Sequence, residues 1–146
     1  MGDAELISWF DEVSMVDCES VGGKGASLGE MHINLKKAGV NVPNGFNVTV
    51  DAYQTFVNSE IPESTWDNIR EPEGVENIRA RAITSNTLAE ALKICLDGAD
   101  PKDHLNMHGR ASLARALVRQ TPVPEVVRQA IITGYSKLCD EYGQGV

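Results

Sequence analysis

The apolar positions near the start of the chain change from a short mixed run to helical spacing. The run Ile7 to Val13 is short and combines strand and helix periods, and we interpret it as a β-strand. Farther on, apolar residues recur at steps of three, four and three, which is the spacing of one helix face. They are Leu28, Met31, Leu35 and Ala38. Gly39 follows and can close this helix in a left-handed conformation.

A proline turn, Val42-Pro43-Asn44-Gly45, separates that helix from a second strand. Phe46, Val48 and Val50 alternate with polar residues, the period of a half-buried strand. Asp51 is a suitable N-cap for a short helix that carries Tyr53, Phe56 and Val57. The first 58 residues therefore predict strand, glycine turn, helix, proline turn, strand and helix, an α/β arrangement with a shared core.

Helical patterns dominate the rest of the chain. Between residues 60 and 108, turn-forming residues separate short helical patterns, and the clearest apolar stripe is Leu88, Ala91, Leu92 and Cys95. Another helix is indicated by Leu113, Leu117 and Val118, until Pro122 and Pro124 interrupt it.

The last helix is predicted to begin at Pro124, with Glu125 in its first turn. Its inward residues are Val127, Ile131 and Leu138, and Gly143 and Gly145 end it. We therefore predict one partial domain over residues 1–146. It comprises a core at 1–58, a divergent or inserted segment at 59–108 and C-terminal helices at 109–146.

Composition and charge narrow the classes of partner. With 146 residues, 42% of them hydrophobic and 23% charged, the chain suits one globular core. A formal charge of -8 and the lack of a long basic run argue against a nucleic-acid partner. The uncharged stretch that contains Val40 to Val50 is too short to span a bilayer, and the acidic start does not resemble a secretory signal. We expect a cytoplasmic protein with no membrane contact.

Several residue types that often carry chemistry show no convincing pattern here. The three cysteines lack a CxxC pair, which favours buried thiols over a disulfide frame or a metal site; they are Cys18, Cys95 and Cys139. His104 and His108 have the spacing of a helical metal site, but Asn106 and Gly109 disfavour a helix there and no third ligand is evident. We expect these two histidines, and also His32, to be solvated. The acidic pairs Asp11-Glu12 and Asp140-Glu141 are interpreted as solvated faces.

The strongest local feature is a glycine-rich turn with a lysine that leads directly into the first long helix. It reads Gly22-Gly23-Lys24-Gly25-Ala26-Ser27-Leu28-Gly29-Glu30-Met31. Glycines allow the backbone to approach an anion, the helix start offers N–H groups and the lysine adds a cation. Ser27 suits the first helical turn better than the role of a nucleophile. The P-loop spacing is absent, so a flexible turn with a solvated lysine remains the alternative.

Three linked motifs resemble the phosphoenolpyruvate synthase (pyruvate, water dikinase) family. They are Val21 to Met31, then Ala38 to Val40 with Val42 to Phe46, then Thr49 to Tyr53 with Phe56. Their order and spacing match that family over about the first 58 residues, and Ala116 to Pro122 and the last helix resemble the end of its first subdomain. Pyruvate, phosphate dikinase and rifampicin phosphotransferase share the glycine turn. The proline turn and the DAY segment are most similar to the synthase.

The resemblance implies the N-terminal subdomain of an ATP-grasp domain of the pyruvate phosphate dikinase type, with a small sheet, packed helices and a helical C-terminal half. It places Lys24, Gly22, Gly23 and Gly25 at the phosphates of ATP, which the family binds with magnesium. In the family, ATP phosphorylates a histidine on another domain, and a barrel domain passes the phosphoryl group to pyruvate. The family thereby converts pyruvate, ATP and water into phosphoenolpyruvate, AMP and phosphate.

The same resemblance implies that other parts of such an enzyme are missing from this chain. The family's arginine-serine-serine motif is expected just past Val146, and the magnesium carboxylates, the phosphorylated histidine and the pyruvate barrel lie farther on. We therefore expect a truncated ATP-binding part that is inactive alone, with weak ATP binding and the absent C-terminal domains as its partners. The alternatives are a stand-alone binding or regulatory module of this fold and a pyruvate, phosphate dikinase fragment. Whether this chain is itself an enzyme stays open.

Overall fold

The computed structural model describes residues 5–143, which form two compact units. Unit 1 contains the residues up to 55 and those from 124 onward, and unit 2 contains residues 56–123. The first predicted subdivision, at 58, lies close to this division, whereas the second, at 108, falls inside unit 2. Among residues 5–143, no helix has both the length and the hydropathy that a membrane span requires.

Unit 1 is built on a two-stranded antiparallel sheet. Strand β1 (Ile7–Trp9) pairs with β2 (Phe46–Val48) so that Trp9 lies opposite Phe46 and Ser8 opposite Asn47. Because successive residues of a strand point to opposite faces, Trp9 and Phe46 share one face and Ser8 and Asn47 share the other. The strand predicted over residues 7–13 is too long, since Phe10–Glu12 forms the 3-10 helix η1.

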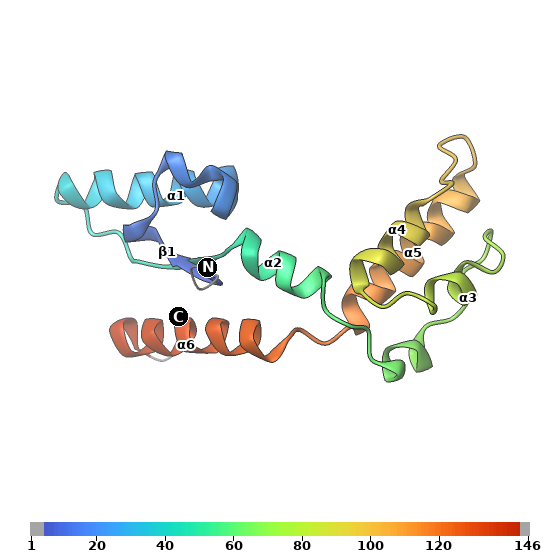
Figure 1. Ribbon diagram of the computed structural model, residues 1–146. Coiled ribbons are helices and arrows are strands. Elements are labelled where there is room, and N and C mark those ends of the chain that lie inside the picture. The colour runs from blue at the N-terminus through green and yellow to red at the C-terminus, as the bar shows by residue number, and fades with distance from the viewer. Residues whose placement is uncertain (1–4, 144–146) are drawn as a thin grey trace. The chain divides into compact units, whose positions relative to one another are not determined.

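One helix covers each face of this sheet, and β1 lies between them in Figure 1. On the aromatic face, α6 (Glu125–Tyr142) packs Tyr135 against Phe46 with ring centroids 5.7 Å apart. Gly134 of α6 lies so close to Phe46 that a Cβ would be 2.7 Å from the ring. On the polar face lies α1 (Cys18–Lys37). Unit 1 is therefore a small three-layer arrangement, in agreement with the predicted α/β arrangement of a small sheet with packed helices.

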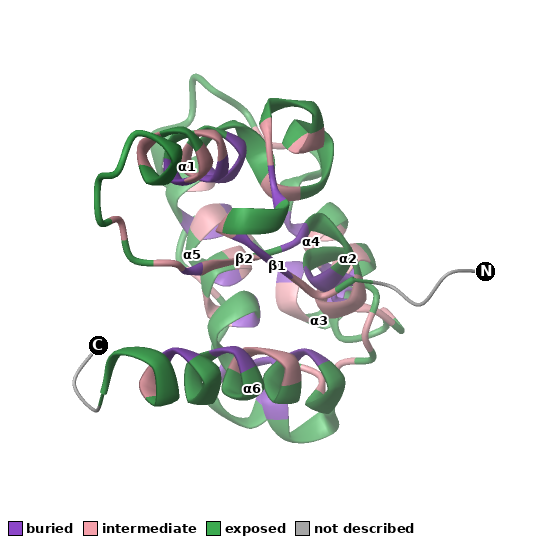
Figure 2. Ribbon diagram, turned by 90° about the vertical axis from the view of Figure 1, so that its left-hand side faces the viewer, coloured by how far each residue is buried: buried purple, intermediate pink, exposed green. Residues whose placement is uncertain are grey.

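The buried face of α1 differs from the predicted apolar stripe. Its fully buried residues are Gly25, Ala26, Gly29 and His32, whereas Met31 is 46% exposed. Figure 2 shows these buried residues as purple bands on a helix that is otherwise pink and green. The prediction failed because the polar face of the sheet approaches α1 too closely for large side chains. The predicted cap is confirmed: Gly39 has φ +81, and its N–H bonds Lys36 O while that of Val40 bonds Leu35 O.

The junction between β2 and the next helix also differs from the prediction. Val48 is 50% exposed, and Val50 is the first residue of α2 (Val50–Val57) rather than part of the strand. The buried hydroxyl of Thr49 accepts a hydrogen bond from the N–H of Ala52 at 3.3 Å, so Thr49 caps this helix. Asp51, the predicted N-cap, lies in the first turn instead.

Unit 2 is helical and encloses a conventional apolar core. It contains the 3-10 helix η3 (Glu63–Asn68), α3 (Ile78–Ala82), α4 (Leu88–Leu96) and α5 (His104–Gln120). The stripe predicted for α4 is confirmed, since Leu88, Ala91 and Cys95 are fully buried. The core is completed by large side chains from the other helices and one loop: Trp66, Ile69, Ile78, Leu113 and Leu117, together with Ala82.

Two predictions about helix limits need correction. The doubt about a helix at His104 was wrong, because α5 begins there with the carboxylate of Asp103 accepting from the N–H of Asn106 at 3.0 Å. Gly109 permits α5 to pass close to the carbonyl oxygen of Glu73. The last helix begins at Glu125 rather than at Pro124 and ends at Gly143 as predicted. Gly145 lies outside the described residues.

Candidate phosphate-binding site

The site predicted from the sequence lies at a kink of α1. At Gly22 the backbone has φ +75 and ψ 161, a conformation that L side chains rarely adopt. The helix resumes at Gly23, so the long part of α1 starts with the residues of the glycine-rich motif. A helix start presents N–H groups and the positive end of the helix dipole, which together attract anions.

The outer side of this turn is open. A Cβ at Gly22 would meet no atom within 4 Å, and one at Gly23 would meet only the Sγ of Cys18 at 3.7 Å. Both glycines are exposed, and so is Lys24. Within the part of the chain that the structure describes, Lys24 takes part in no ion pair. An anion can therefore approach the backbone here and meet an ammonium group that no described carboxylate pairs with.

Gly25 lies on the inner side of the same turn. It is buried, and a Cβ there would lie 2.6 Å from Oδ1 and 3.0 Å from Cγ of Asn47 on β2. One turn later, Gly29 approaches the carbonyl oxygen of Val13 even more closely. The sequence assigns Gly22, Gly23 and Gly25 together to a phosphate-binding turn. In the structure, Gly22 and Gly23 are exposed, whereas Gly25 is buried and packs against Asn47. The four-residue spacing of Gly25 and Gly29 is the sequence signal that could have identified this face.

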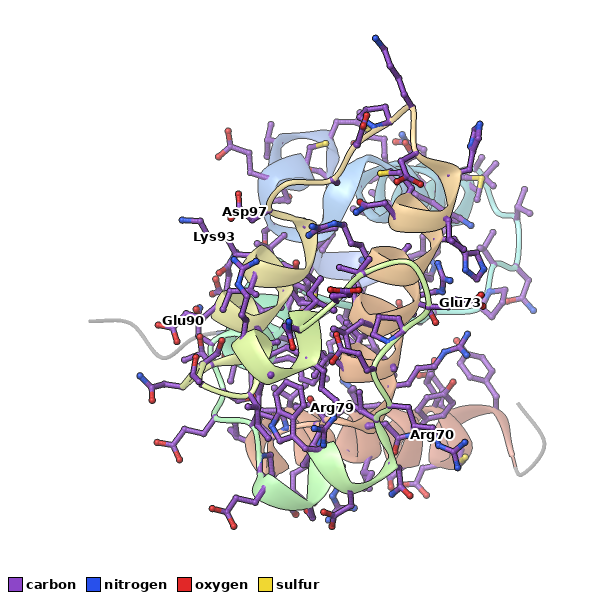
Figure 3. The ribbon with its side chains drawn as sticks, turned by 90° about the vertical axis from the view of Figure 1, so that its right-hand side faces the viewer. Arg70, Glu73, Arg79, Glu90, Lys93 and Asp97 are labelled. Atoms are coloured by element: carbon purple, nitrogen blue, oxygen red, sulfur yellow. The ribbon has the colours of Figure 1, made fainter. Side chains whose placement is uncertain are left out.

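Two arginines of unit 2 are engaged in hydrogen bonds with backbone carbonyl groups. Arg110 is buried and donates to the carbonyl oxygen of Cys95 at 3.1 Å and to that of Asp97. Arg79 donates to the carbonyl oxygens of Ile69 at 2.6 Å and Trp66 at 2.9 Å. In Figure 3, Arg79 lies among the helices, whereas labelled charged residues of α4 point outward. Both arginines therefore serve to satisfy backbone carbonyls at helix ends.

The histidines divide into two groups. His104 and His108 are exposed on α5, as expected. His32 is only 1% exposed and its Nδ1 lies 3.2 Å from the carbonyl oxygen of Pro43, so the expectation of a solvated side chain was wrong. Residues 5–143 contain no group of three His, Cys, Asp or Glu side chains placed to hold a metal ion.

The remaining candidates have local roles. The hydroxyl of Ser27 donates to the carbonyl oxygen of Gly23 at 2.8 Å, within the first turns of the helix. Cys18 is exposed, contrary to the expected burial, whereas burial raises the pKa of the Cys95 thiol to about 11. Cys139 is half-buried and also free. The acidic pairs Asp11-Glu12 and Asp140-Glu141 are exposed, as predicted.

Comparison with known proteins shows the class to which this fold and turn belong. The family described as "Pyruvate phosphate dikinase, AMP/ATP-binding domain" matches residues 18–146, and the chain belongs to this family. The match includes the glycine turn, the proline turn and all of unit 2. The segment 59–108 thus lies within the matched region, and its description as divergent or inserted stays a prediction.

The similar proteins are phosphoenolpyruvate synthases. A phosphoenolpyruvate synthase of Synechocystis sp. is 34% identical over 142 residues, which are 97% of this chain and 14% of that protein. A probable phosphoenolpyruvate synthase of Methanocaldococcus jannaschii is 35% identical over 98% of this chain and 10% of its own length. The Escherichia coli synthase is 50% identical over a shorter segment, 38% of this chain and 7% of that protein. The chain thus spans a small fraction of the relatives it matches.

Proposed function

We propose that residues 22–24 bind the phosphates of ATP, and that the chain supplies this part of the nucleotide site of a phosphoenolpyruvate synthase. The observation that carries the proposal is the open glycine turn at the start of a long helix, with a Lys24 that forms no ion pair among residues 5–143. Membership of an AMP/ATP-binding domain family supports a nucleotide as the anion. The assignment of individual residues rests on this geometry and on the motif.

The roles of the three residues follow from their positions. Gly22 permits the kink that exposes the helix start, and Gly23 leaves room for a phosphate oxygen next to the backbone. Lys24 adds a charge-assisted hydrogen bond that a neutral side chain cannot provide. Gly25, the fourth residue assigned from the resemblance, contributes to the proposal through the packing of the turn and not through an exposed surface.

For the complete reaction, we propose the chemistry suggested by the synthases that the chain resembles. ATP and water would phosphorylate a histidine with release of AMP and phosphate, and the phosphoryl group would then pass from the histidine to pyruvate to give phosphoenolpyruvate. No histidine of this chain is assigned that role. We expect magnesium to accompany ATP, and we assign it to none of residues 5–143, which form no suitable cluster of ligands.

Titration of the 146-residue chain with Mg-ATP, followed by amide NMR, tests the proposal. We expect weak binding, with a dissociation constant of about 1 mM, and the largest signal changes at Gly22, Gly23 and Lys24. Lys24→Ala should weaken binding about tenfold because it removes a charge-assisted contact. AMP should bind more weakly than ATP because it carries fewer phosphates.

Lys37→Ala is the matched control, since Lys37 is another exposed lysine of α1, in its last turn. It should leave ATP binding unchanged. If both substitutions weaken ATP binding equally, Lys24 contributes only through the overall positive charge and not through a specific contact with the phosphates. Signal changes confined to residues outside the turn would contradict the assignment of the site.

A further inference from the structure

The side chain of Asn47 lies directly beneath the proposed phosphate turn. Asn47 is the middle residue of β2 and projects from the polar face of the sheet, next to Ser8 of β1. Its Oδ1 and Cγ occupy the space that a side chain at position 25 would need, at 2.6 and 3.0 Å from an ideal Cβ. The first turn of the long helix is therefore in close contact with this amide group.

The amide nitrogen of Asn47 makes this position unusual. Its Nδ2 is buried and has no hydrogen-bond partner among residues 5–143. A buried amide without a partner lowers stability, and an apolar residue of similar shape would remove that cost. Sites that proteins use for binding are where such locally unfavourable groups are expected.

We infer that Asn47 is a positioning residue of the phosphate site, which sets the height of Gly22, Gly23 and Lys24 above the sheet through its contact with Gly25. The inference rests on the proposed function of the turn and adds a residue that the motif does not contain. Gly25 and Asn47 form the contact as a pair. The absence of a side chain at 25 admits the amide, and the amide supports the backbone that carries Lys24.

The experiment compares Asn47→Ala with Asn34→Ala in the 146-residue chain. Asn34 lies on α1, and its exposed amide donates to Glu30, so it serves as the control. We expect Asn47→Ala to shift the amide NMR signals of Gly22, Gly23 and Lys24 without ligand and to weaken ATP binding about fivefold, with little change in melting temperature. Asn34→Ala should do neither. If Asn47→Ala fails to fold, Asn47→Ser provides the same comparison with a hydroxyl in place of the amide.

A second pair of variants tests the contact itself. Gly25→Ala should weaken ATP binding about tenfold, because its methyl group meets the Asn47 amide. Adding Asn47→Ala removes the two closest atoms and should restore most of that loss. Independent, additive effects of the two substitutions would overturn the inference.

The outcomes separate this inference from the proposed function. If ATP binds through Lys24 but Asn47→Ala leaves both the turn signals and the affinity unchanged, Asn47 is not a positioning residue and the proposed function stands. A different result is that Asn47→Ala reverses the shift of the turn signals caused by Gly25→Ala, while ATP gives no response that depends on Lys24. In that case Asn47 still positions the turn. The phosphate assignment then fails.

Discussion

The two units of this chain are packed by different means. Unit 2 encloses large apolar side chains such as Leu117 and Ile78, which are essentially inaccessible to solvent. In unit 1, α1 packs through glycines instead: Gly25 lies close to the amide of Asn47 on β2, and Gly29 lies close to the carbonyl oxygen of Val13. The unit that carries the proposed site thus relies there on close approach of main chains rather than on large side chains.

This difference has a physical consequence for the site. Glycines in α1 let the helix approach the sheet and Val13 closely, which fixes the position of its first turn. A conventional apolar layer would hold the same helix farther away. Close backbone packing tolerates no added atoms, whereas an apolar core responds mainly to atoms removed. The two units should therefore be sensitive to opposite kinds of substitution.

Removing atoms from the core of unit 2 should give the largest effect. Leu117 is fully buried, so Leu117→Ala should lower the free energy of unfolding by about 3 kcal/mol. Cys95 lies in the same core and its pKa is raised to about 11 by burial, which makes its reaction with a thiol reagent a measure of opening. We expect labelling of Cys95 to accelerate roughly a hundredfold.

The labelling is done with Cys18 and Cys139 replaced by serine, because they are more accessible than Cys95. Leu96→Ala is the control, since Leu96 is 59% exposed and belongs to the same core-forming segment. It should leave the labelling rate nearly unchanged. Similar rates for the two variants would mean that Cys95 is exposed by a local opening that leaves Leu117 in place.

Adding one carbon to α1 should give the next largest effect. A Cβ at Gly29 would overlap the carbonyl oxygen of Val13, so Gly29→Ala should destabilise unit 1 by about 2 kcal/mol, measured by thermal unfolding. Gly23→Ala is the matched control, because its Cβ would have only an ordinary contact with Cys18 and alanine favours a helix. It should be neutral or slightly stabilising. Equal destabilisation by both would disprove close packing as the organising feature of this helix.

The contrast between the units also explains what the sequence could predict. In unit 2, apolar periodicity found the buried stripe of α4 and the core positions Leu113 and Leu117, because large side chains face the core. In unit 1, periodicity selected Met31, which is exposed, and missed Gly25 and Gly29. Hydrophobic patterns do not report a face made of glycine and alanine. Only the linked motifs indicated that this region carries a candidate binding site.

The candidate site was predicted in part for the same reason. The exposed turn at Gly22, Gly23 and Lys24 is local and follows from the motif, with its positive φ at Gly22. The role of Gly25 depends on Asn47, which is 22 positions farther along the chain and opposite Ser8 in the sheet. Such a contact depends on strand register, which turn and periodicity signals do not reveal.

The smallest expected effect concerns the start of α6, where the chain returns from unit 2 to unit 1. Hydrogen bonds from Arg128, at 2.6 and 2.7 Å, and from Gln129 lower the pKa of Glu125 from its ordinary value of 4.5 to about 2. A carboxyl whose pKa is lowered by folding stabilises the folded state above its unfolded pKa. That contribution is lost as the pH falls from about 4.5 through 2.

NMR titration of the Glu125 carboxyl should therefore show a midpoint near 2. Arg128→Ala should raise it toward 4.5 but not completely, because Gln129 and the helix start remain. The change in stability between pH 4.5 and 2 should be small, since both side chains are more than half exposed and the pair is screened by solvent and salt. Lys137→Ala, which removes a cation on the same helix that lies 4.2 Å from the Trp9 ring centroid, should not move the midpoint. A midpoint that stays near 2 in Arg128→Ala would show that the hydrogen bonds from Arg128 are not the main cause of the lowered pKa of Glu125.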